Sequence, residues 1–185
     1  MRRPALLTAV LLAVLLLTGC GASETEPVPS ARAAEPQQVE LGWRESYPTT
    51  GERIRFDVDE LDVRAEAWSV RIAVTNATRT SFELGVNRTQ LSFGLMLFAT
   101  GTLDELEEAN RSGRLPPVRL AATMKPPPPN VLRPGATWRA TLAGPGSLAD
   151  GSYLRVAFGP LRAVGDPPAG IQPVVVWITD RSHKL

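Results

Sequence analysis

The chain has 185 residues, with 20 basic and 19 acidic side chains, one histidine and one cysteine, and its formal net charge is +1 at pH 7. A charge balance this close to zero argues against nucleic acid as a partner. One cysteine cannot form a disulfide within the chain, and one cysteine with one histidine cannot supply the ligands of a structural zinc site.

The first 20 residues have the pattern of a secretion signal. Arg2 and Arg3 give a positive start, residues 5–17 form an apolar run, and the sequence then reads Leu17-Thr18-Gly19-Cys20. The run is shorter than the stretch of about 20 apolar residues that a transmembrane helix needs. This start resembles the lipobox of bacterial lipoproteins, in which a leucine stands three positions before a cysteine.

The resemblance implies that residues 1–19 are a signal peptide and that Cys20, once lipidated, begins the mature protein. Two acyl chains on Cys20 would anchor the protein stably at the extracytoplasmic face of the cell membrane. The alternative is that Cys20 is only a small residue at the end of an ordinary signal peptide.

Composition divides the remaining chain in two. Residues 20–38 are rich in Ala, Ser, Glu and Pro and contain almost no large apolar side chains, so we expect a disordered tether there. Residues 39–185 are expected to form one domain, long enough to bury about two-thirds of its unfolded surface.

Alternation of apolar and polar residues predicts the first strands. Ile54, Phe56 and Val58 alternate with polar residues, and the phase then slips to Leu61 and Val63, which predicts a bulge near Asp59-Glu60. Further alternation runs over residues 68–76. Residues 91–98 start alternating and become apolar throughout, which is typical of a central strand covered on both faces.

One helix is expected within the strand pattern. Thr102 precedes Leu103, Asp104 and Glu105 in the arrangement of a capping box, and Gly113 is a suitable stop. We therefore predict a helix over residues 103–111, lying across an end of the sheets.

The second half of the chain continues as short strands and turns. We predict strands at 118–122, 138–142, 154–158 and 174–178, a polyproline stretch at 126–129, a type II turn at Leu132-Arg133-Pro134-Gly135 and a tight turn at Asp150-Gly151. About seven or eight short strands with one short helix indicate an all-β antiparallel sandwich.

Three segments resemble bacterial immunoglobulin-like domains. Residues 68–76 give an aromatic-started strand that ends in Asn76, residues 132–138 contain the Leu-x-Pro-Gly turn, and residues 151–156 form a Gly-x-Tyr-type strand. The resemblance implies an immunoglobulin-like β-sandwich, and it implies nothing about activity.

No reactive constellation stands out in the sequence. His183 is the third residue from the end of the sequence, where chains usually fray, and this argues against a catalytic triad. The carboxylates of Asp57, Asp59, Glu60 and Asp62 resemble a calcium loop only loosely, since no glycine supplies the sharp turn; the alternative is the solvent face of a strand. We therefore predict no enzymatic activity, no metal and no cofactor.

The sequence offers two candidate contact regions. Trp43 and Tyr47 could stack on a sugar or a partner, or could simply pack the first strand onto the core. A rigid proline-rich loop contains the other candidates, Pro127, Pro128, Pro129 and Asn130. Trp68, Trp138 and Trp177 are expected in the core, because each stands in an alternating strand.

The functional hypothesis from sequence is a non-catalytic lipoprotein of the cell envelope that binds another envelope protein or serves as an accessory module. The alternative is a lipoprotein that binds a small solute, such as a sugar or a lipid, for a transporter.

Overall fold

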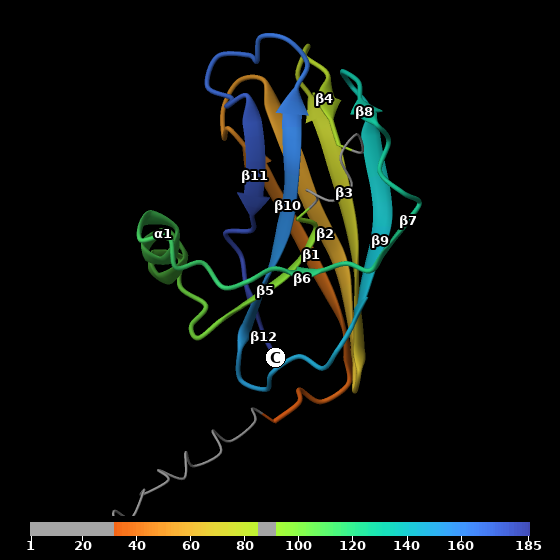
Figure 1. The fold of residues 1–185 in the computed structure, drawn as a ribbon, viewed down its shortest axis with the longest axis vertical. Coiled ribbons are helices and arrows are strands. Elements are labelled where there is room, and N and C mark those ends of the chain that lie inside the picture. The colour runs from red at the N-terminus through yellow and green to blue at the C-terminus, as the bar shows by residue number, and fades with distance from the viewer. Residues whose placement is uncertain (1–31, 85–91) are drawn as a thin grey trace, which may run out of the picture. The chain divides into compact units, whose positions relative to one another are not determined.

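The alternating segments of the sequence pair into two antiparallel sheets in the computed structural model, which describes residues 32–84 and 92–185 (Figure 1). The first sheet has five strands in the order β1-β2-β3-β9-β7. Their bounds are β1 Gln37–Tyr47, β2 Arg53–Arg64, β3 Ala67–Ala77, β9 Thr137–Pro145 and β7 Thr123–Lys125.

The second sheet is built around β10 (Tyr153–Ala163), which has neighbours on both sides. On one side it pairs with β5 and β4, and on the other with β11 and β12. The remaining strands, β6 and β8, extend the sheet from β5 and β4. The bounds are β4 Phe82–Glu83, β5 Gly94–Phe98, β6 Arg119–Leu120, β8 Val131–Leu132, β11 Val174–Ile178 and β12 His183–Lys184.

The architecture is the predicted all-β sandwich with one helix. Seven of the strands within the described residues have five residues or more, and the other five have only two or three. The two sheets enclose one main core of inward-facing side chains, and Phe56, Ile72, Val156 and Phe158 in it have no exposed surface.

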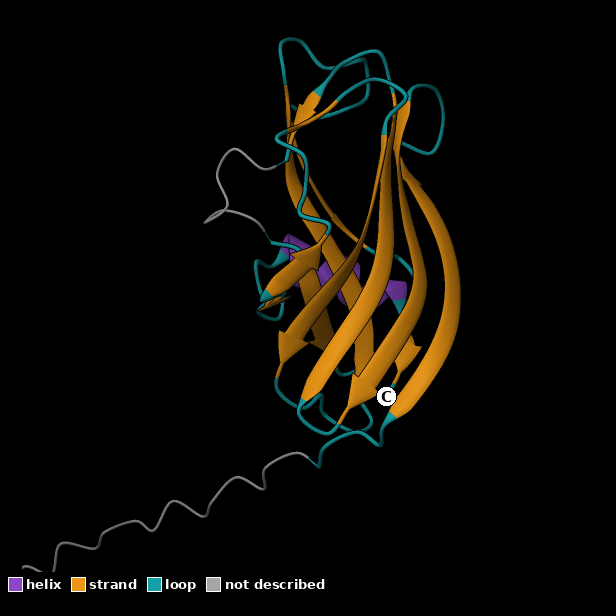
Figure 2. Ribbon diagram, turned by 90° about the vertical axis from the view of Figure 1, so that its right-hand side faces the viewer, coloured by secondary structure: helices purple, strands orange, loops and turns teal. Residues whose placement is uncertain are grey.

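The predicted bulge is confirmed at Asp59. Val58 pairs with Ile72 of β3, and the next pair is Glu60 with Arg71, so Asp59 is the extra residue. This insertion restores the inward direction of Leu61, which is fully buried. Bulges bend a strand and increase its twist, and Figure 2 shows the long strands of this sheet as curved ribbons.

The expectation that the strand at 91–98 is covered on both faces is confirmed for β5. Leu95 faces the main core, whereas Met96 and Phe98 face a second, smaller core with Ala157 and Leu106. Leu106 belongs to the helix α1 (Leu103–Arg111), which has the predicted bounds and the predicted N-cap, Thr102.

The position expected for the helix was wrong. The helix does not lie across an end of the sheets: Figure 1 shows it to the side of β11, and its Leu106 packs with Met96 and Phe98, which point to the outer face of β5. The reason is that Met96 and Phe98 present apolar surface on the outer face of β5, and the Leu106 side of α1 covers it.

The ordered domain begins before residue 39, the boundary expected from composition. Ala33 pairs with Ala149, the Ala34 amide donates to the Leu148 carbonyl oxygen over 2.8 Å, and Ala34 is 4% exposed. Small side chains at these positions allow the segment to pack closely, so residues 32–38 belong to the domain. Cys20 and the expected tether up to residue 31 lie outside the described residues.

Asn76 explains why β3 ends where it does. Its side chain is fully buried; Nδ2 donates to the carbonyl oxygens of Thr80 (2.8 Å) and Leu132 (3.0 Å), and Oδ1 accepts from the hydroxyl of Thr78 (2.7 Å). The backbone of Asn76 also bonds to the predicted turn, which lies one residue later than expected because the Ala136 amide donates to the Arg133 carbonyl oxygen. Gly135 is therefore the third residue of the turn, and its φ of +74° is what a type II turn requires there. One side chain thus joins the β3–β4 loop to β8 in the other sheet.

We expect Asn76→Ala to lower the free energy of unfolding by about 2–3 kcal/mol, because it leaves buried carbonyl and hydroxyl groups without a partner. Urea unfolding measures this, with Asn110→Ala on the exposed side of α1 as the control. The control should change stability by less than about 0.5 kcal/mol. Equal midpoints for wild type and Asn76→Ala would mean that water replaces the amide at no cost.

Candidate functional site

The two aromatic residues predicted as a contact surface, Trp43 and Tyr47, differ in how far they are buried. Trp43 is 6% exposed and belongs to the main core, so the packing alternative applies to it. Tyr47 is half-buried, with its ring centroid 5.8 Å from that of Trp177. Trp177, expected in the core, is itself half-buried and stacks on Phe56 at 5.6 Å between ring centroids.

The proline-rich loop borders a hollow of about 350 Å³, which we call the proline groove. The hollow lies where β8, the Leu-x-Pro-Gly turn and the start of β9 come together. Its lining residues are Pro127, Pro129, Val131, Leu132, Arg133, Ala136, Thr137 and Trp138.

The loop beside the proline groove is held at both ends. Trp138 Nε1–H donates to the Pro126 carbonyl oxygen over 3.2 Å, and the Leu84 amide donates to the Asn130 carbonyl oxygen over 3.0 Å. Between these bonds Pro128 is buried, while Pro127 and Asn130 are exposed. Proline fixes φ and has no amide hydrogen, so this segment loses little conformational freedom when a ligand binds.

A rigid apolar groove of this kind can accept an apolar side chain or a short extended segment of a partner. Val131 at its wall is 39% exposed although it is a β-branched apolar residue. Beneath the groove Trp138 is 5% exposed and meets Phe93 edge to face, with 5.3 Å between ring centroids. The wall is therefore supported by the main core.

The four carboxylates considered as a calcium loop lie on β2, and arginines from neighbouring strands contact three of them. Arg44 lies 2.8 Å from Asp59 and 3.6 Å from Asp57, and Arg71 contacts Glu60. Within residues 32–84 and 92–185, no group of three or more His, Cys, Asp or Glu residues is arranged to hold a metal ion.

A second hollow, also of about 350 Å³, lies between α1 and β11. Trp177 and Val176 form its wall, Leu103 borders it from the helix, and the carboxylates of Glu107 and Asp180 lie at its edge. An aromatic wall with nearby carboxylates is suited to a small polar ligand such as a sugar. We call this space the helix hollow.

Glu45, on the other sheet, holds two of the residues that line the helix hollow, Trp177 and Asp180. Its carboxylate accepts hydrogen bonds from Trp177 Nε1–H (2.9 Å) and from the amides of Asp180 (2.9 Å) and Arg181 (3.0 Å). Burial and the nearby Glu45 raise the pKa of Asp180, and Arg155 lowers it less. These contacts join residues that are far apart in the sequence, so the local pattern around Glu45 does not predict them.

Arg155 is the buried charge that the sequence pattern did not reveal. It has no exposed surface, and its guanidinium donates to the carbonyl oxygens of Thr179 (2.7 Å), Thr102 (2.8 Å), Gly101 (3.1 Å) and Asp180. Burial lowers the pKa of Arg155, while nearby carboxylates raise it less. Arg155 therefore joins the loop before α1 to the loop after β11.

We expect Asp180→Asn to raise the free energy of unfolding at neutral pH, because the raised pKa of Asp180 means that its charged form disfavours the fold. The gain should be complete above the folded-state pKa and disappear as the pH falls through it towards the ordinary value of 3.8. Urea unfolding across pH tests this, with Asp166→Asn, at another exposed position, as the control. No gain at neutral pH would contradict it.

Among the residues that the structure covers, no helix has the length and apolar character to cross a membrane. His183, the single histidine, lies in β12 with its Nε2 3.0 Å from Gln37 Oε1, and burial lowers its pKa.

Comparison with protein-family models, with curated proteins and with solved structures found no match to this chain.

Proposed function

We propose that the chain is a lipid-anchored, extracytoplasmic and non-catalytic binding module, and that the proline groove holds an apolar segment of an envelope protein. The observation that carries the proposal is the loop itself: prolines hold its shape, hydrogen bonds fix both ends, and Val131 remains exposed beside it. Preorganised apolar surface of this kind favours binding, because little entropy is lost when a partner is ordered on it.

The test is affinity capture from an envelope extract under cross-linking, using wild type and two variants. Val131→Arg places a charge in the proline groove, and Val164→Arg makes the same change at another exposed valine, away from the groove. The proposal requires a stoichiometric partner that Val131→Arg loses and Val164→Arg retains. Capture that both variants retain equally would exclude the groove as the binding surface.

The anchor is tested separately. We expect Cys20→Ser to release the protein from the membrane fraction without changing its urea midpoint, since Cys20 stands before the alternating strand segments of the sequence. Membrane fractionation after salt washing measures the release, and a mutant that still sediments with membranes would rule out the lipid anchor.

A second candidate function, binding of a small solute such as a sugar or lipid, is favoured by the helix hollow with its Trp177 wall. A ligand at about 100 times its dissociation constant should stabilise the fold by roughly 2.7 kcal/mol in a thermal-shift screen. Leu103→Arg at the rim should abolish that shift, and a shift that persists in this variant would place the solute elsewhere.

A further inference from the structure

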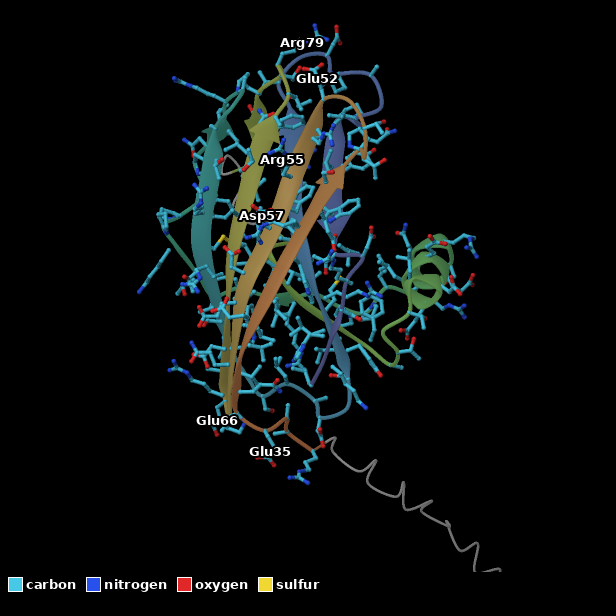
Figure 3. The ribbon with its side chains drawn as sticks, turned by 180° about the vertical axis from the view of Figure 1, so that it is seen from behind. Glu35, Glu52, Arg55, Asp57, Glu66 and Arg79 are labelled. Carbon is cyan, nitrogen blue, oxygen red and sulfur yellow. The ribbon has the colours of Figure 1, made fainter. Side chains whose placement is uncertain are left out.

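Two rows of side chains cross the outer face of the first sheet and enclose a hollow of about 610 Å³. One row runs through Ser46, Arg55, Thr75 and Thr137, on four adjacent strands. The next row runs through Arg44, Asp57, Ala73 and Arg139. This face is towards the viewer in Figure 3, with Arg55 and Asp57 labelled near the middle of the sheet.

Two threonine side chains give this hollow a polar floor, Thr75 on β3 and Thr137 on β9. Ala73 lies on the same face of β3 and is only 3% exposed, because longer side chains around it cover it. The hydroxyl oxygens of Thr75 and Thr137 lie 2.8 Å apart beside it. Arginines border the floor: Arg44 on β1, Arg53 and Arg55 on β2, and Arg139 on β9.

Four arginines border the hollow, and of these four only Arg44 forms an ion pair with a carboxylate among the described residues. Arg44 is paired with Asp57 and Asp59, and Arg53 donates to the carbonyl oxygens of Gly51 (2.9 Å) and Thr49 (3.1 Å).

Arg55 and Arg139 form no hydrogen bond or ion pair with other described residues, and both are exposed. Burial raises the pKa of Asp57, so the neighbouring arginines do not fully offset its loss of hydration. Glu45 also borders the hollow, but its carboxylate is bonded to Trp177 and the residues after β11.

We propose that this hollow, the arginine hollow, binds a compact oxyanion of the phosphate type between Arg55 and Arg139. Their strands flank β3, so the two backbones are about 10 Å apart, and two arginine side chains can reach one group held between them. Guanidinium groups donate paired hydrogen bonds to phosphate oxygens. One of the two threonine hydroxyls below can donate to a remaining oxygen, because only the other is the donor in the Thr75–Thr137 hydrogen bond. Several donors around one position suit a tetrahedral oxyanion better than a carboxylate.

The first arm of the test is titration of inorganic phosphate into the chain at low ionic strength, followed by calorimetry and by NMR of the arginine Nε–H groups. Arg55→Gln/Arg139→Gln should weaken binding at least tenfold. Arg64→Gln/Arg114→Gln removes the same charge from ion-paired exposed arginines and should leave binding within about twofold. Asp57→Asn should strengthen binding, because it removes the negative charge in the hollow.

The second arm identifies the source of the oxyanion. The Cys20→Ser chain, which lacks the anchoring cysteine, is sedimented with vesicles of phosphatidylglycerol or of phosphatidylcholine. Binding only to the anionic vesicles, lost in Arg55→Gln/Arg139→Gln, would assign the hollow to a lipid headgroup. Phosphate binding without vesicle binding would assign it to a soluble phosphate compound.

Two results would overturn the proposal. One is equal weakening by Arg55→Gln/Arg139→Gln and by Arg64→Gln/Arg114→Gln, which would mean that binding follows net charge and not this site. The other is the absence of binding in both arms by wild-type protein. Because all four arginines are exposed, a urea midpoint for each variant separates loss of binding from loss of fold.

Discussion

Trp68→Ala is expected to lower the free energy of unfolding by about 3–5 kcal/mol, the range for truncating a large buried aromatic side chain. Trp68 is 2% exposed and packs against Gly144 on β9, where an added Cβ would lie 2.6 Å from the indole Cζ2. Total stability of a domain is about 5–15 kcal/mol, so this variant should be close to unfolding at room temperature. Urea or thermal unfolding measures the loss.

Two further variants separate packing from hydrogen bonding at Trp68. The indole Nε1–H has no partner among the described residues, so Trp68→Phe should be less damaging than Trp68→Ala. Gly144→Ala should destabilise wild type and have little effect in Trp68→Ala, where the clash is removed. Additive losses in the double mutant would contradict the packing described here.

Trp138→Ala should fall in the same range of about 3–5 kcal/mol, because Trp138 is 5% exposed and supports Phe93. It should also release the proline-rich loop, whose Pro126 carbonyl oxygen accepts from the Trp138 indole. A urea midpoint equal to that of wild type would contradict its place in the core.

Arg155→Met should lower the free energy of unfolding by about 3–5 kcal/mol, because several carbonyl oxygens lose their donor and each such buried group costs about 1–3 kcal/mol. The substitution leaves four backbone carbonyl oxygens, in the loop before α1 and in the loop after β11, without their shared donor. We expect faster amide hydrogen exchange at Asp180 and Arg181, whose amides donate to Glu45 in the same region.

A matched control for Arg155 is Arg71→Met, which removes a surface ion pair with Glu60. Surface ion pairs contribute about 0.2–1 kcal/mol, so this variant should remain close to wild type. If Arg155→Met were equally mild, water would have to satisfy the four carbonyl oxygens, and the link between the two loops would not depend on the arginine.

The local sequence pattern was sufficient to predict most of the fold. The helix at 103–111 follows from the Thr102 cap, and the bulge at Asp59 follows from the phase slip between Val58 and Leu61. The type II turn follows from Pro134-Gly135, because proline fixes one φ and glycine permits the next. Each of these features depends on residues within a few positions of one another.

The features that the local sequence pattern did not predict depend on contacts between residues far apart in the sequence. Trp43 stands in the same alternating phase as Val39 and Leu41 of β1, but only its packing on the main core decides between the two alternatives that the sequence left open. Glu45 contacts Trp177, which lies 132 positions away. The arginine hollow was missed for the same reason, since Arg55 and Arg139 come together only when β2 and β9 flank β3.

The most direct test of the proposed binding module is site-specific photo-cross-linking in intact cells, with a photoreactive amino acid at position 131 in the proline groove. Position 164, an exposed valine away from the groove, carries the same amino acid in the control. We expect one dominant cross-linked envelope protein from position 131 and none from position 164. Cross-links to the same proteins from both positions, or none from position 131, would contradict it.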